Sequence, residues 1–191
     1  MRRDLFVGLD QTGAVDRRGT PRPLPGVVLG RRGKDWRLEA FYLPRLEEGA
    51  LRDQLTKLGF PYMRKKLALL LDCVLGVPAA ANPKNKPLSF FLKRAAEADG
   101  YGRAASRRFF QEILAECSDL AGNGFPKRKV ELLTGSNSVF QLHPFQKNIQ
   151  TGSYRFWKEL GSESDWYFVA SQESPDPELA LVLEAYPSLA R

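Results

Sequence analysis

Three acidic residues stand out because each closes a short apolar run. Asp10 follows Leu5-Phe6-Val7-Gly8-Leu9, Asp72 follows five apolar residues, and Glu184 lies near the end of the run at 179–185. Clustered carboxylates repel one another, so a site that gathers three of them is expected to bind a divalent cation. Mg²⁺ or Mn²⁺ is the expected ion.

Such a cluster could hydrolyse a phosphodiester without a serine or histidine nucleophile. Of two ions about 4 Å apart, one can activate a water and the other can stabilise the leaving oxygen. The single histidine, His143, precedes a proline, and we interpret it as a packed or surface imidazole. Cys73 and Cys117 have no partners at metal-ligand spacing, so buried thiols are expected rather than a zinc site or a disulfide.

The first half of the chain is predicted to place Asp10 and Asp72 at neighbouring strand ends. The run before Asp72 is short and wholly apolar, as in a central strand buried on both faces. If its strand is a parallel neighbour of the first, the two carboxylates meet outside the carboxyl ends of the strands. Residues 47–58 have the leucine spacing of a helix. Three segments are predicted to form an antiparallel meander: residues 4–10, 26–30 and 36–43.

The second half is predicted to hold a helical insertion at about 79–130 and two late strands. Residues 132–161 supply aromatic core without a clean period, and within them residues 153–160 have helical character. The sequence thus predicts a single α/β domain over residues 1–191, a mixed sheet flanked by helices. The further predicted elements are helices at 90–98 and 103–115 and strands at 166–170 and 179–185.

Composition favours an anionic partner. The chain has 29 Lys and Arg against 22 Asp and Glu, a net charge of +7, which is compatible with nucleic acid. No apolar run is long enough for a membrane span, and no signal-peptide region follows the first residues, so we expect a cytoplasmic protein without membrane contact. The excess charge lies in short clusters: Arg17-Arg18, Arg31-Arg32, Arg64-Lys65-Lys66, Arg107-Arg108 and Lys127-Arg128-Lys129.

Three sequence blocks resemble the predicted RNase H-like nuclease family, also known as domain of unknown function 429. They are residues 6–10, ending in Asp10, residues 71–78, Leu-Asp-Cys-Val-Leu-Gly-Val-Pro, and residues 183–188, Leu-Glu-Ala-Tyr-Pro-Ser. The resemblance implies a ribonuclease-H-like fold, with Asp10, Asp72 and Glu184 as metal-binding acids of a nuclease. Enzymes of that fold usually continue into a helix that adds a further acid, whereas this sequence stops at Arg191.

Two other functions stay open at this point. Asp10 could be a turn residue whose carboxylate accepts N–H bonds from Thr12 or Gly13, which would leave a catalytically silent domain that binds nucleic acid or a protein partner. Residues 8–13, Gly-Leu-Asp-Gln-Thr-Gly, also loosely fit the phosphate-binding turn of the sugar kinase, Hsp70 and actin group. ATP binding is therefore the remaining alternative.

Overall fold

Six strands form one sheet in the order β3-β2-β1-β4-β6-β5. The computed structural model describes residues 3–10, 14–116, 125–135, 138–140, 149–169 and 176–185. The strands are β1 (Leu5–Leu9), β2 (Leu24–Arg32), β3 (Asp35–Leu43), β4 (Leu67–Leu71), β5 (Tyr167–Val169) and β6 (Ala180–Glu184). Every strand predicted from the sequence is present, with its boundaries within a few residues.

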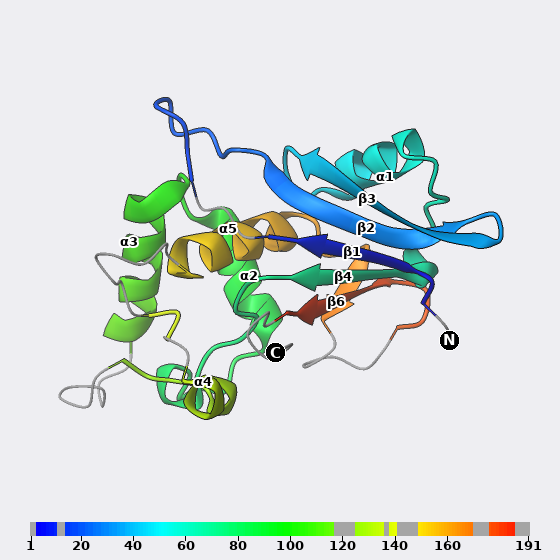
Figure 1. Ribbon diagram of the computed structural model, residues 1–191. Helices are drawn as coiled ribbons and strands as arrows, with labels where there is room; N and C mark the ends of the chain where they lie inside the picture. The colour runs from blue at the N-terminus through cyan, green and yellow to red at the C-terminus, as the bar shows by residue number, and fades with distance from the viewer. Residues whose placement is uncertain are drawn as a thin grey trace.

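Strand directions agree with the predicted mixed sheet. β2 is antiparallel to both β1 and β3, which makes the expected meander. β4 is parallel to β1, β6 is parallel to β4, and β5 is parallel to β6 at the sheet edge. The last strand in the sequence, β6, therefore lies between β4 and β5, and β5 forms the edge of the sheet. The carboxyl ends of β1, β4 and β6 all lie at the same end of the sheet (Figure 1).

Five α-helices connect and cover these strands in the described part of the chain. α1, α2 and α3 match the three predicted helices, and α5 extends the predicted one in both directions. The short α4 was not predicted, because its two leucines, Leu132 and Leu133, are exposed and give no amphipathic pattern. The bounds are α1 (Glu48–Lys57), α2 (Leu88–Glu97), α3 (Gly102–Ala115), α4 (Lys129–Thr134) and α5 (Ile149–Ser162).

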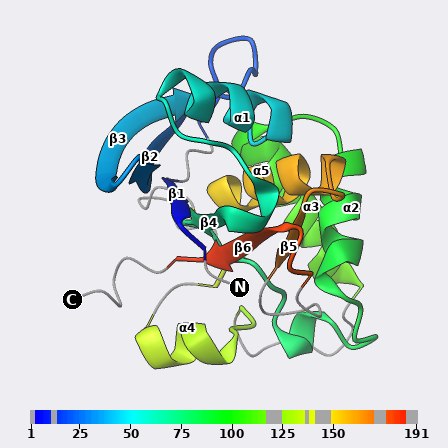
Figure 2. The same ribbon diagram turned by 90° about the vertical axis from the view of Figure 1, so that its right-hand side faces the viewer.

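The core lies between one face of the sheet and α1, α2, α3 and α5 (Figure 2). On β1 the alternating residues Leu5, Val7 and Leu9 point into this core. Helices α2 and α5 approach closely at Gly161, where an added Cβ would lie 2.0 Å from the carbonyl oxygen of Leu92. No larger residue fits there without moving a backbone.

The end of the sheet at which the parallel strands terminate faces the helical part of the molecule. α3, α4 and the loop of residues 14–22 lie beyond it (Figure 1). In an open sheet this is where side chains from different strands can converge on a ligand. Over the residues described, no helix has the length and apolar character that a membrane crossing needs.

Candidate functional site

Asp10 and Asp72 come together at the ends of β1 and β4. The parallel register pairs Leu9 with Leu71, so the two aspartates are the next pair along. The backbone N–H of Asp72 donates to the carbonyl of Leu9 at 3.0 Å, which continues the ladder to this point. Their convergence was predicted from strand order, and the structure has it.

The two carboxyl groups interact directly. Burial raises the pKa of Asp72, and the negative charge of Asp10 and a side-chain hydrogen bond with it raise the pKa further. Asp72 is half-buried whereas Asp10 is exposed. Two adjacent carboxylates at a strand end favour a bound cation, which offsets their mutual repulsion.

Glu184 reaches the same edge but points to the other side of the sheet. It pairs in register with Leu71, whose side chain lies in the core, whereas Asp72 is one residue further and points to the opposite face. Both oxygens of the Glu184 carboxylate are used by Arg128, at 2.6 and 2.7 Å, and one also accepts the N–H of Leu75 at 2.8 Å. The structure therefore does not bring Glu184 to the aspartate pair.

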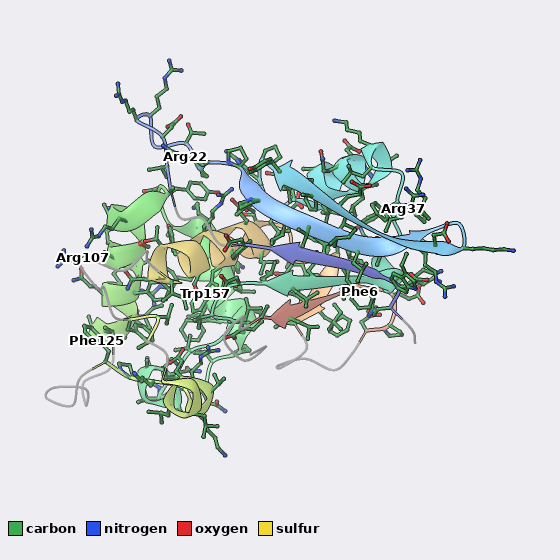
Figure 3. The ribbon with its side chains drawn as sticks, in the orientation of Figure 1. Phe6, Arg22, Arg37, Arg107, Phe125 and Trp157 are labelled. Carbon is green, nitrogen blue, oxygen red and sulfur yellow. The ribbon has the colours of Figure 1, made fainter. Side chains whose placement is uncertain are left out.

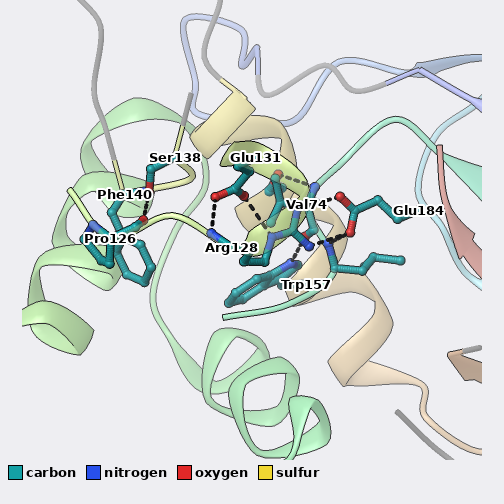
Figure 4. A network of polar contacts seen from close by, with 10 residues as sticks. Val74, Pro126, Arg128, Glu131, Ser138, Phe140, Trp157 and Glu184 are labelled. Carbon is teal, nitrogen blue, oxygen red and sulfur yellow. Dashed lines mark hydrogen bonds and ion pairs between the residues drawn. The ribbon is translucent and has the colours of Figure 1, made fainter. Parts of the chain in front are cut away.

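The partner of Glu184, Arg128, was noted in the sequence only as part of a basic cluster. Figure 4 shows its guanidinium between Glu184 and Glu131. Its Nε donates to Glu131 at 2.8 Å, and the backbone N–H of Arg128 donates to the other oxygen of the same carboxylate at 2.8 Å. Glu131 is fully buried. One arginine thus forms ion pairs with two carboxylates and fixes the start of α4 to the end of β6.

The loop after Asp72 is held by the helical layer. The N–H of Val74 donates to Ser153 at 2.9 Å, and its carbonyl accepts the indole N–H of Trp157 at 2.6 Å (Figure 4). Cys73 is buried, as predicted, and burial together with the nearby Glu184 and Asp72 raises the pKa of its thiol. Asp72 is therefore presented from a fixed segment.

Several sequence predictions fall outside the described residues. Among them are the turn contacts of Asp10 with Thr12 and Gly13, on which the silent-domain and ATP alternatives partly depend. The same holds for His143 and Cys117.

A pocket of about 460 Å³ adjoins the aspartate pair on the face of the sheet away from the helices. Its lining includes Gly8, Leu70, Val27 and Tyr42 together with Asp10 and Asp72. An apolar surface beside two acids suits a ligand with both a flat apolar part and a part that binds a cation.

The basic clusters divide between the two ends of the sheet. Arg31-Arg32 and Arg64-Lys65-Lys66 lie at the amino ends of β1 and β4. Arg17-Arg18 and Arg107-Arg108 are exposed on the loop and on α3 beyond the carboxyl ends, the side of the aspartate pair. Figure 3 shows this separation through Arg107 at one end and Arg37 near the other.

Within the described residues no group of three or more His, Cys, Asp or Glu side chains is arranged to hold a metal ion. The aspartate pair is thus the candidate site, and Glu184 as a third metal ligand stays a prediction. Comparison with protein-family models, curated proteins and solved structures gives no significant match. The resemblance to the RNase H-like nuclease family therefore depends on the three sequence blocks alone.

Proposed function

We propose that this protein is a divalent-metal-dependent nuclease of ribonuclease-H-like fold that hydrolyses phosphodiester bonds in RNA or DNA at Asp10 and Asp72. The observation that carries the proposal is the meeting of these two carboxylates at the ends of adjacent parallel strands. A nucleic-acid substrate is supported by the net charge of +7 and by the exposed arginine pairs on the same side as the aspartates.

The donor set fits one magnesium or manganese ion. Mg²⁺ is commonly bound by one or two carboxylates, with water and substrate phosphate oxygens filling the other positions. Burial and the neighbouring negative charge of Asp10 raise the pKa of Asp72, and a bound cation would offset that repulsion. The ion would supply Lewis-acid activation of water and of the phosphoryl oxygen.

The protein's own residues would then hold the ion and position the nucleic acid. Asp10 and Asp72 fix the ion position from two rigid strand ends. The loop of Cys73 and Val74, hydrogen-bonded to α5, keeps Asp72 from turning away. Arg107 and Arg108, exposed on α3, would hold the phosphate backbone without selecting a sequence.

Calorimetric titration with Mn²⁺ tests the site directly. We expect the wild type to bind the ion and Asp10→Asn to bind it at least tenfold more weakly, because half of the anionic donor set is lost; tenfold corresponds to about 1.4 kcal/mol. Asp53→Asn, an exposed aspartate of α1, is the matched control and should titrate like the wild type. Equal heats for wild type and Asp10→Asn would refute the carboxylate site.

Glu184→Gln separates a third metal ligand from a structural partner of Arg128. Because Glu184 faces Arg128 on the opposite side of the sheet, we expect the Mn²⁺ dissociation constant to rise less than about threefold. Urea denaturation should instead show a loss of about 1–3 kcal/mol, since a bidentate charged pair is weakened. A tenfold loss of Mn²⁺ affinity would place Glu184 in the metal site, as the sequence predicted.

A further inference from the structure

The pocket beside the aspartate pair contains a gap in one row of side chains. Strand pairing aligns four of its lining residues across the sheet: Ala40, Val27, Gly8 and Leu70. Side chains of this row point away from the helices, because their neighbours along the strands, such as Leu9 and Leu71, lie in the core. Gly8 has no side chain, so the row is open between Val27 and Leu70.

Gly8 provides space rather than backbone freedom. It lies inside β1 and pairs in regular register with Val27 on one side and Leu70 on the other, so neither a bulge nor a positive φ requires glycine here. Among the described residues that are not its chain neighbours, a Cβ added to Gly8 would have one contact within 4 Å, Cγ2 of Val27 at 3.3 Å. A glycine inside a strand weakens the strand and often marks the close approach of a ligand. The position therefore indicates a ligand that lies close to the sheet surface.

The next row toward the carboxyl ends of β1 and β4 sets an aromatic ring and the two acids around the same pocket. Tyr42 of β3 lines the pocket with a side chain that is 69% exposed, and Asp10 and Asp72 line it from β1 and β4. Pro25 lies between the ring and the acids, because it pairs with Tyr42 and its carbonyl accepts the N–H of Asp10 at 3.0 Å. Neighbouring strands are about 4.8 Å apart, so roughly 10 Å separates the backbones of Tyr42 and Asp10. The pocket thus extends from an exposed ring to the proposed metal site.

The pocket offers an occupant few hydrogen-bonding groups. Gly8 and Val27 each pair with a strand on both sides, so their backbone N–H and C=O groups belong to the strand ladders. The polar side chains among the described lining residues are those of Tyr42, Asp10 and Asp72, and the two acids face the proposed cation. Selection of one base requires hydrogen bonds to its edge, whereas stacking tolerates every base because each has a flat π-face. The pocket is therefore suited to a flat ring that is held by packing, without selection among rings.

We propose that the pocket holds one unpaired nucleobase of a single-stranded nucleic acid, beside the phosphodiester that is cleaved; this inference rests on the nuclease function proposed above. A nucleotide combines the two parts that suit the pocket, a flat ring for Tyr42 and Gly8 and a phosphate for a cation held by the acids. Arg107 and Arg108, exposed beyond the same strand ends, attract the neighbouring phosphates. In a duplex each base is paired and stacked, so it must first be flipped out. The substrate is therefore single-stranded, and its cleavage is insensitive to base identity.

Metal-free binding tests the base pocket without cleavage. Fluorescence anisotropy measures the affinity of the full chain, in EDTA, for a labelled oligothymidylate and for the same strand with abasic sites in place of its bases. We expect Tyr42→Ala to raise the dissociation constant of the intact strand about fivefold or more, because one stacked base is lost, and to leave that of the abasic strand unchanged. The acids repel phosphate in every variant, so the ratio of the two constants reports on the base.

Phe90→Ala is the matched control for this measurement. Phe90 of α2 is an aromatic residue that is 41% exposed and lies outside the lining of the pocket, so its variant should bind both strands like the wild type. Equal dissociation constants for the wild type and Tyr42→Ala on the intact strand would overturn the proposal. So would an equal loss of affinity for the intact and the abasic strand.

Cleavage with Mn²⁺ tests the strand preference. We expect the wild type to cleave a single strand about tenfold or more faster than the duplex of the same sequence, at similar rates next to all four bases. Gly8→Val, which fills the gap in the row, should slow cleavage of the single strand but leave the Mn²⁺ affinity unchanged in calorimetry. A duplex that is cleaved as fast as the single strand would overturn the base pocket and leave the nuclease proposal standing. Absence of cleavage from both forms would refute the nuclease, whereas the anisotropy ratio would still decide the base pocket.

Discussion

Replacing Asp72 with asparagine is expected to lower the Mn²⁺-dependent rate of phosphodiester cleavage by about two to three orders of magnitude. Loss of one of two anionic ligands removes several kcal/mol of charge stabilisation at the developing oxyanions, and each 1.4 kcal/mol is about tenfold in rate. The measurement is single-turnover cleavage of end-labelled single-stranded RNA and DNA oligonucleotides, with Asp53→Asn as control.

The stability of the Asp72→Asn variant distinguishes a lost ligand from a damaged fold. The pKa of Asp72 is raised in the fold, so its contribution to stability is largest at low pH and is lost as pH rises through the folded pKa. At neutral pH, without metal, the neutral asparagine should therefore leave the free energy of unfolding unchanged or higher. A variant that is inactive because it is unfolded, or one that is folded and fully active, would count against the assignment.

The same pKa predicts how ion binding responds to pH. Because protons and the cation compete for Asp72, Mn²⁺ affinity should fall as pH decreases through the raised pKa of that group. The residual binding of Asp72→Asn should lack this dependence.

The second large effect is expected at a buried ion pair in α5. Arg155 and Glu159 are each only 2% exposed, and Nε of Arg155 lies 2.8 Å from a carboxylate oxygen of Glu159. The other oxygen accepts the N–H of Leu46 at 2.7 Å, and Arg155 donates to the carbonyls of Arg22 and Pro44. This pair joins α5 to the segment that precedes β2 and to the segment that follows β3.

Arg155→Met should lower the free energy of unfolding by about 3–5 kcal/mol, because it leaves the Glu159 carboxylate buried without its cation. For a chain of this length that is a fall in melting temperature of roughly 10 °C, measured by thermal denaturation followed by circular dichroism. Arg94→Met, which removes more exposed pairs to Glu112 and Glu116, should cost at most about 1 kcal/mol.

Two further measurements identify the cause of that loss. Burial raises the pKa of Glu159 even with Arg155 present, so without the arginine it should be higher still. A carboxyl group with a raised folded pKa favours folding at low pH, so part of the stability of Arg155→Met should return on acidification. Arg155→Met combined with Glu159→Met should be less destabilised than the single variant. A double variant that loses the sum of both effects would argue against the uncompensated charge.

Much of the sheet could be predicted from local sequence. The apolar runs at β1 and β4 are short, uninterrupted and closed by an acid, which is typical of buried strands. Parallel neighbours necessarily present their carboxyl ends at one edge, so the meeting of Asp10 and Asp72 followed from strand order. The antiparallel meander likewise followed from three successive strands, the first two joined by an elongated hairpin loop and the last two by a tight turn at residues 33–34.

The face on which each acid lies was a matter for the tertiary structure. Side chains alternate between the two faces of a sheet. Because Glu184 pairs with Leu71 and not with Asp72, Glu184 points to the core side and Asp72 to the face away from the helices. Register between strands more than a hundred residues apart is set by packing, which no local pattern encodes. Arg128 also meets Glu184 across 56 residues, from the N-cap position of a helix whose leucines are exposed.

The sequence by itself thus determined the strand types, their ends and the aspartate pair, because these depend on runs of neighbouring residues. Only the tertiary structure decided that β6 lies between β4 and β5 and that Arg128 pairs with Glu184. These features depend on contacts between residues distant in the chain, whose free energies compete only once the sheet has formed.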